Sequence, residues 1–121
     1  MTAATGLLLV VDDEEMNRDM LSRRLEVEGY SVLTAASGAE ALERCRSLGP
    51  DVVLLDIGLP QANGFEVAKW LRGEECGKDA ILVALTGWSG DEERRLAAEA
   101  GFNHYLVKPV PMTELEKIVF G

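Results

Sequence analysis

The chain has 121 residues, of which 12 are basic and 21 acidic, and its formal net charge is −9. This length suits one domain around a single core, and the acidity disfavours nucleic-acid backbones and anionic membranes as direct partners. Neither a secretory leader nor a membrane span is expected, because a basic opening segment is missing and the first apolar run, 7–11, meets Asp12 at once.

Short apolar runs alternate with segments of helical spacing along the chain. Runs that are apolar at nearly every position are typical of strands in a parallel sheet, which is covered on both faces. Strands are therefore predicted over residues 7–11, 31–35, 52–55, 80–85 and 105–107.

Helix signals lie between these runs. The first helical segment ends at Gly29, a residue type that commonly terminates helices. Ser37 with Glu40, and Ser89 with Glu92, have the spacing of capping boxes at helix starts. Helices are predicted over residues 14–28, 37–46, 64–72, 89–101 and 112–119.

This alternation predicts a doubly wound (βα)5 α/β fold, a three-layer sandwich with helices on both faces of a parallel five-stranded sheet. The whole chain, 1–121, is expected to form one domain. In such sheets, ligands bind beyond the carboxyl ends of the strands. The residues that follow each apolar run are therefore the candidates for a functional site.

Polar side chains follow four of the predicted strands. Asp12 and Asp13 follow the first, Asp56 the third, and Lys108 the fifth, while Thr86 ends the fourth. Each has a purely structural explanation alone, since aspartate caps helices and turns, threonine suits strands and lysine suits surfaces. Their coincidence at four strand ends makes a shared site the better interpretation.

The residue types indicate the chemistry. Clustered carboxylates with no nearby cysteine or histidine are typical of a hard-cation site, and Mg²⁺ is the best candidate. Lys108 can neutralise phosphoryl oxygens, and the Thr86 hydroxyl can donate a hydrogen bond to one. Asp56 stands by itself after its strand, whereas Asp12 and Asp13 are paired as metal ligands are, so Asp56 is the predicted nucleophile.

The two cysteines, Cys45 and Cys76, have no C-x-x-C or metal-type spacing. We expect two buried or half-buried thiols in a reduced, cytoplasmic setting.

Taken together, these residues resemble the receiver domain of two-component response regulators over essentially the whole length. The resemblance implies the flavodoxin-like strand order 2-1-3-4-5. The segments DIGLP, ALTGW and AGFNHYLVKPV are most similar to receivers associated with hybrid histidine kinases. The motifs that carry the match are Asp12-Asp13, Asp56 with Pro60, Gly64, Thr86, and Tyr105-x-x-Lys108-Pro109.

The resemblance implies that Asp56 accepts a phosphoryl group from a phosphohistidine of a histidine kinase or a histidine phosphotransfer protein. It implies that Asp13, Asp56 and the backbone carbonyl of Gly58 hold Mg²⁺, with Asp12 reaching the ion partly through water. Such a domain is no conventional enzyme, since it catalyses only its own phosphorylation and dephosphorylation.

The resemblance also implies a switch. Lys108 and Thr86 contact the phosphoryl group, Thr86 moves toward it, and the ring of Tyr105 follows. The Lys108–Pro109 bond is a candidate for the cis form. The face made by the fourth helix, fifth strand and fifth helix then signals to a downstream protein partner.

Two departures from the family pattern concern partner contacts and phosphoryl lifetime. Residues 61–63, Gln-Ala-Asn, precede Gly64 where the family more often has methionine and aspartate. Trp88, two residues beyond Thr86, has the size to shield an aspartyl phosphate from water, or to contact a partner.

Three other functions fit the sequence less well. A phosphatase of the haloacid dehalogenase type needs a second aspartate two residues after the nucleophile, where Gly58 stands. A flavin carrier needs a phosphate-binding loop after the first strand, where residues 12–15 are all acidic. A receiver-like module used only for docking would not need the intact acidic, threonine and lysine set.

Overall fold

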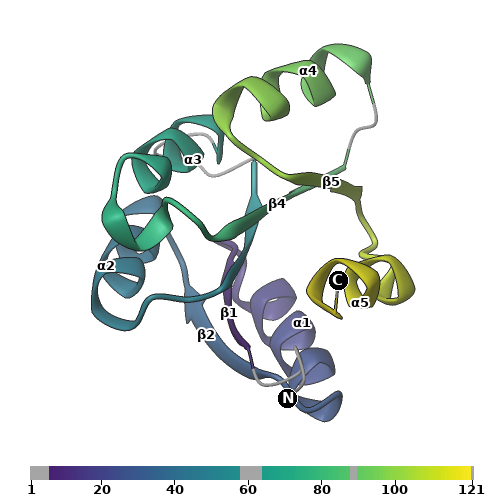
Figure 1. The fold of residues 1–121 in the computed structure, drawn as a ribbon. Coiled ribbons are helices and arrows are strands. Elements are labelled where there is room, and N and C mark those ends of the chain that lie inside the picture. The colour runs from purple at the N-terminus through teal and green to yellow at the C-terminus, as the bar shows by residue number, and fades with distance from the viewer. Residues whose placement is uncertain (1–5, 58–63, 88–89, 121) are drawn as a thin grey trace.

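A computed structural model describes residues 6–57, 64–87 and 90–120 and alternates strands with helices (Figure 1). All the predicted strands and helices are present, and their ends lie within two residues of the predicted ones. One short 3-10 helix, η2, was not predicted. The elements are β1 (Leu7–Val11), α1 (Glu15–Val27), β2 (Ser31–Ala35), α2 (Gly38–Leu48), β3 (Val52–Asp56), α3 (Gly64–Arg72), η2 (Glu75–Gly77), β4 (Ile81–Thr86), α4 (Asp91–Ala100), β5 (His104–Val107) and α5 (Met112–Phe120).

The strands form one parallel sheet in the order β2-β1-β3-β4-β5, which confirms the predicted order. Val11 at the end of β1 is level with Leu55 of β3, and Thr86 at the end of β4 is level with Val107 of β5. The residues that follow these strands therefore meet at one edge of the sheet, which we call the carboxyl edge.

Successive strand residues point to opposite faces of the sheet, and each face has its own layer of helices. Leu8 and Val10 of β1 pack in a cluster with Leu25 of α1 and Leu115 of α5. Full burial of one such leucine contributes roughly 1.5–3 kcal/mol.

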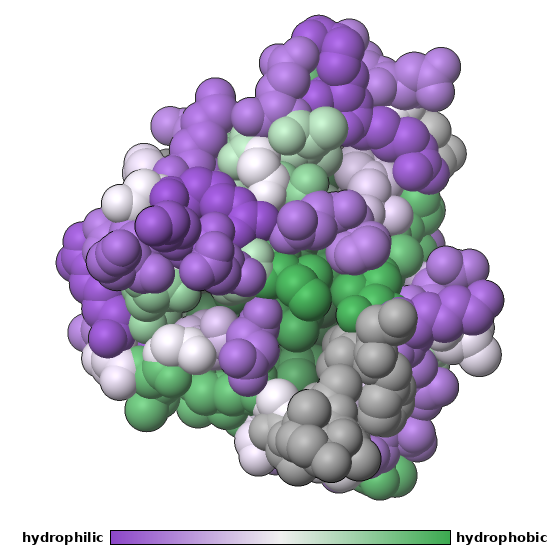
Figure 2. Space-filling model, viewed as in Figure 1, coloured by the Kyte–Doolittle hydropathy of each residue, from purple (hydrophilic) through white to green (hydrophobic). Residues whose placement is uncertain are grey.

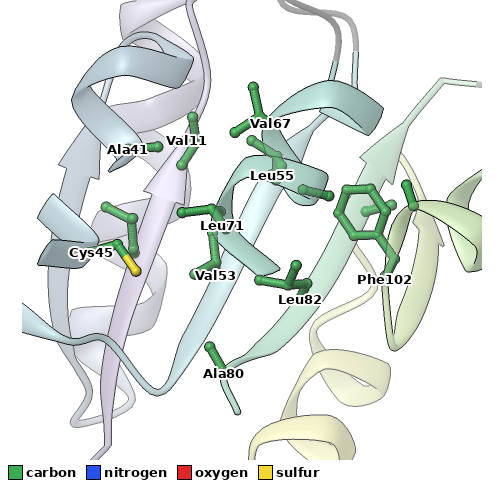
Figure 3. Close-up of a cluster of buried hydrophobic side chains, with 14 of the residues drawn as sticks. Val11, Ala41, Cys45, Val53, Leu55, Val67, Leu71, Ala80, Leu82 and Phe102 are labelled. Atoms are coloured by element: carbon green, nitrogen blue, oxygen red, sulfur yellow. The ribbon is translucent and has the colours of Figure 1, made fainter. Parts of the chain in front are cut away.

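On the opposite face, Leu9 and Val11 of β1 pack in a second cluster with residues of α2, α3 and α4, part of which Figure 3 draws. The three layers visible in Figure 1, with α1 and α5 on one side and α2, α3 and α4 on the other, follow from this alternation.

The two predicted capping boxes differ in outcome. The Ser37 side chain accepts a hydrogen bond from the Glu40 N–H at 3.2 Å, and the Glu40 carboxylate accepts one from the Ala36 N–H at 2.7 Å. The second box is wrong as a helix start, because α4 begins at Asp91 and its N-cap is Gly90, without a side-chain capping bond. Ser89 itself lies outside the described residues.

Arg72 stabilises the connection from α3 to β4 by hydrogen bonds. Its guanidinium donates hydrogen bonds to the carbonyl oxygens of Gly77, Ala80 and Gly101 at 2.9, 2.6 and 2.7 Å, and to Oδ1 of Asn103 at 2.7 Å. One side chain thereby joins the end of α3, the start of β4 and the loop between α4 and β5.

The cysteines form a disulfide that the sequence did not indicate. Cys45 of α2 is fully buried, as Figure 3 shows among its apolar neighbours, and it is bonded to half-buried Cys76 of η2. The predicted burial is confirmed, but the expectation of two free thiols is wrong. Folding brings together two residues that are 31 positions apart, a spacing that matches no sequence motif.

The surface differs between the helices. Figure 2 shows mostly hydrophilic side chains over α4, whereas α1 exposes the apolar side chains of Met16, Met20 and Val27. Within the described parts of the chain, no helix has both the length and the apolar character needed to cross a membrane.

Candidate functional site

Three carboxylates meet at the carboxyl edge of the sheet. Asp12, Asp13 and Asp56 each offer an oxygen, and these atoms lie within 4.8 Å of one another. The parallel pairing of β1 with β3 places Asp12 beside Asp56. Asp12 is 5 % exposed, Asp56 is half-buried and Asp13 is exposed, so the cluster has a buried side and a solvent side.

The backbone around Asp12 is held on both sides. Its N–H donates to the Ala35 carbonyl at 3.1 Å, and its own carbonyl accepts a hydrogen bond from the Arg18 guanidinium at 2.9 Å. Its side-chain Oδ1 accepts a hydrogen bond from the Glu14 N–H at 2.9 Å. These bonds fix the carboxylate at the start of α1.

Burial raises the pKa of Asp12 above its ordinary value, because the charged form loses contact with water. The Glu14 N–H and the Lys108 ammonium oppose this shift, while the charges of Asp56 and Asp13 add to it. Burial therefore outweighs the hydrogen bond and the lysine charge, and the pKa of Asp12 is raised overall.

Lys108 reaches the cluster from the end of β5. Its Nζ donates a hydrogen bond to Oδ2 of Asp56 at 3.2 Å and lies 3.6 Å from Oδ2 of Asp12. Its backbone N–H donates to the Thr86 carbonyl at 2.7 Å, and its bond to Pro109 is cis. Burial lowers the pKa of Lys108, but the charges of Asp56 and Asp12 outweigh that effect, and the pKa is raised overall.

Thr86 and Tyr105 lie on neighbouring strands. Thr86 ends β4 and is 5 % exposed, whereas Tyr105 of β5 is half-buried. The guanidinium of Arg94 lies over the Tyr105 ring, 4.7 Å from its centroid. Sequence pattern alone does not distinguish Arg94 from its neighbour Arg95, because only the packing of α4 against β5 does so.

A pocket of about 400 Å³ lies next to the site, between α1 and the residues after β5. Asp12 and Lys108 form part of its polar wall, and Met20, Leu21 and Val110 form part of its apolar wall. No sequence motif marks this apolar wall, since it depends on how α1 packs beside the end of β5.

The structure thus brings together Asp12, Asp13, Asp56 and Lys108, with Thr86 at the end of the adjacent strand. Four other residues of interest, Gly58, Pro60, Asn63 and Trp88, lie outside the described residues, and so do Gln61 and Ala62.

The donor set fits a magnesium ion. Three carboxylates face one ammonium, which leaves two negative charges in excess (3 − 1) and matches one divalent cation. Mg²⁺ takes oxygen ligands, keeps several waters and is usually held by one or two carboxylates. Exposed Asp13 leaves the solvent side open for those waters.

Comparison with known proteins gives a consistent result. Residues 8–120 match the family described as "Response regulator receiver domain". The polar-differentiation response regulator DivK of Brucella ovis is 36 % identical over 108 residues, which cover 88 % of this chain and 86 % of DivK.

Two solved structures are similar over nearly the whole chain. The receiver domain of the sensor histidine kinase PA1611 from Pseudomonas aeruginosa, which has magnesium coordinated in its active-site cleft, aligns with a TM-score of 0.86 at 30 % identity, covering 96 % of this chain and 95 % of that one. The second is the Saccharomyces cerevisiae complex of the histidine phosphotransfer signalling protein Ypd1 with the receiver domain of Ssk1. That match has a TM-score of 0.87 at 29 % identity and covers 96 % of this chain and 87 % of that one.

Proposed function

Because this chain belongs to the response regulator receiver family of two-component signalling, we propose that it is a phosphoacceptor switch in a phosphorelay. The whole chain, 1–121, is then one receiver domain. The observation that carries the proposal is the contact between the Lys108 ammonium and Asp56, 3.2 Å long, within a cluster of three carboxylates.

Asp56 is the proposed acceptor. One of its carboxylate oxygens attacks the phosphorus of a phosphohistidine, the phosphorus–nitrogen bond breaks, and the imidazole nitrogen keeps the electron pair. Asp56 suits this role because it is half-buried and lies beside a cation, whereas Asp12 is almost fully buried and already accepts the Glu14 N–H. Hydrolysis of the aspartyl phosphate returns the domain to its starting state.

Lys108 and the metal site divide the electrostatic work. Asp12, Asp13 and Asp56 would hold Mg²⁺, which would supply positive charge near the transferring phosphoryl oxygens. Lys108 faces Asp56 and Asp12 and supplies a second positive charge. The Gly58 carbonyl remains a predicted ligand. These groups act only on the domain's own acceptor, so we propose no conventional enzymatic activity.

The switch is proposed to run from Thr86 through Tyr105 to the face formed by α4, β5 and α5. Thr86 is buried next to the acceptor strand, and Tyr105 lies beneath Arg94 of α4. Moving a two-state equilibrium from 1:99 to 99:1 requires roughly 5.5 kcal/mol of differential binding. New Thr86 and Lys108 contacts with the phosphoryl group would supply it.

The proposed phosphoryl donor is a histidine kinase or a histidine phosphotransfer protein. Two neighbours support this: a receiver of a sensor histidine kinase and a receiver crystallised with Ypd1. We propose that this phosphoryl transfer takes place in the cytoplasm. The switched face would then bind a further, downstream protein.

Phosphorylation with acetyl phosphate and Mg²⁺ tests the proposal. The purified chain should gain one phosphoryl group by intact-protein mass, and Asp56→Asn should gain none. Asp79→Asn, a change at an exposed aspartate before β4, is the matched control and should label like the wild type. Full labelling of Asp56→Asn would show that another carboxylate is the acceptor. Absence of labelling in the wild type would favour a docking module.

A further inference from the structure

The disulfide joins two elements that the acceptor site does not involve. Cys45 lies in the second half of α2, and Cys76 is the central residue of η2, which precedes β4. They are the only two cysteines of the chain, and their Cα atoms are 5.8 Å apart. Since α2 ends before β3 begins and η2 precedes β4, the bond lies toward the amino edge of the sheet, opposite the carboxylates.

Other contacts hold the two cysteines together independently of the bond. The guanidinium of Arg46 donates two hydrogen bonds to the carboxylate of Glu74, at 2.8 and 3.0 Å, between α2 and the residue before η2. Arg72 donates to the Gly77 carbonyl at 2.9 Å. Gly77 itself is packed against the Leu71 carbonyl, where an added Cβ would clash with the oxygen.

These contacts have a consequence for the reduced protein. When the sulfur–sulfur bond is broken, η2 keeps its place beside α2, so the two thiols remain close to each other. Once a small disulfide has formed a mixed disulfide with one of them, the neighbouring thiolate displaces the small thiol far faster than a free thiol in solution would. Re-formation of the bond is therefore intramolecular and needs no large movement of the chain.

The two sulfurs differ in access. Cys45 is 0 % exposed, whereas Cys76 is half-buried, so Cys76 is the residue of the pair that an external thiolate would attack. This attack breaks the disulfide, forms a mixed disulfide on Cys76, and releases the thiolate of Cys45, which takes up a proton. A second external thiolate then attacks the mixed disulfide and releases the Cys76 thiol and a small disulfide. Two electrons pass from two small thiols to the protein, and the reverse sequence oxidises it.

From these observations we propose that Cys45 and Cys76 are a reversible dithiol–disulfide site whose redox partner is a low-molecular-weight thiol and its disulfide, such as glutathione. The cellular setting rests on the proposed function, because disulfides in cytoplasmic proteins are usually transient or redox-sensing rather than permanent. The bond cross-links a loop of about 31 residues and therefore raises the stability of the fold. The acceptor site at the opposite edge keeps its chemistry in both states.

Redox titration of the full chain tests this proposal. The protein is equilibrated in glutathione buffers of graded composition, quenched with acid and alkylated with N-ethylmaleimide in denaturant, so that buried Cys45 also reacts. Its intact mass is then measured. Free thiols should rise from none to two across the series, and the oxidised form should melt at the higher temperature. The doubly substituted variant Cys45→Ala/Cys76→Ser should fold and show no redox-dependent change in melting temperature.

Two outcomes of the redox titration would overturn the proposal. Two alkylated thiols in the most oxidising buffer would show that the bond does not form. A bond that survives a large excess of reduced glutathione in the folded protein would be a permanent one. Asp56 labelling with acetyl phosphate, measured on both redox forms, should be equal. Loss of labelling in both forms would count against the phosphoacceptor function and leave the redox titration intact.

Discussion

The ammonium nitrogen of Lys108 lies 3.2 Å from Oδ2 of Asp56, a contact between residues 52 positions apart in the chain. Replacing Lys108 with methionine removes this charge and keeps all but the last atom of the side chain's length. Loss of one preorganised stabilising group typically slows a reaction by about 100-fold or more. We therefore expect a drop of that order in the rate of Asp56 labelling from acetyl phosphate, measured by mass under single-turnover conditions.

Lys117 of α5 supplies the control for this substitution, because it is exposed and belongs to no described ion pair. Lys117→Met should label at the wild-type rate. An unchanged rate in Lys108→Met would show that the ammonium plays no part in the transfer.

The carboxylate cluster predicts that one substitution stabilises the metal-free protein but weakens its stabilisation by Mg²⁺. Burial and the neighbouring charges raise the pKa of Asp12, so its ionised form destabilises the metal-free protein. Asp12→Asn should raise the melting temperature in EDTA. When Mg²⁺ is added, the melting temperature of this variant should rise less than that of the wild type. The variant lacks one carboxylate that holds the ion, and binding of the ion stabilises the folded state.

Thermal melts with and without Mg²⁺ check this expectation, and Asp19→Asn, at an exposed position of α1, is the control. An equal Mg²⁺-induced shift in Asp12→Asn and the wild type would remove Asp12 from the ligand set.

Arg46 and Glu74 predict a pH dependence of stability. The hydrogen bond from Arg46 lowers the pKa of the Glu74 carboxyl below its ordinary value of 4.5. A lowered pKa means that the folded state binds fewer protons than the unfolded state. The contribution of this pair is therefore fully present above pH 4.5 and is lost as the pH falls through the lower, folded pKa.

As the pH falls through that acidic range, the free energy of unfolding should decrease less in Glu74→Gln than in the wild type. Denaturant-induced unfolding at a series of pH values measures this. Glu75→Gln, at the adjacent exposed position, should behave like the wild type. Parallel acid profiles for Glu74→Gln and the wild type would contradict the assignment.

The Arg94 guanidinium over the Tyr105 ring predicts a measurable coupling. Cation–π contacts at exposed positions contribute about 0.5–1 kcal/mol. A double-mutant cycle with Arg94→Ala and Tyr105→Leu should give a coupling energy in that range for unfolding. Arg95→Ala is the matched control, because Arg95 pairs with Glu92 and Glu99 on α4 itself. Equal coupling for both arginines would mean that the ring contact has no specific effect.

Much of the fold and site could be predicted from the sequence because both depend on local patterns. Apolar runs marked the strands, and the polar residue after each run had to lie at the carboxyl edge once the strands were parallel. Asp12, Asp56 and Lys108 therefore meet as expected.

The remaining features depend on contacts between elements. The Cys45–Cys76 bond requires α2 to lie beside η2, and η2 is too short to show an apolar pattern in the sequence. Position 90 rather than 89 caps α4, and one arginine of two meets Tyr105. None of these features follows from the spacing of residues in the sequence, because each depends on how the helices pack against the sheet and against one another.

The hydrogen bonds of Arg72 limit which substitutions position 72 can tolerate. Its guanidinium satisfies acceptors from three separate segments, so a substitution there leaves several of them unpaired at once. No single compensating change elsewhere can restore them all, and even lysine lacks the fork of donors. In a library of random variants, position 72 should therefore tolerate fewer replacements than the exposed neighbours Lys69 and Gly73, although it is remote from the reacting groups.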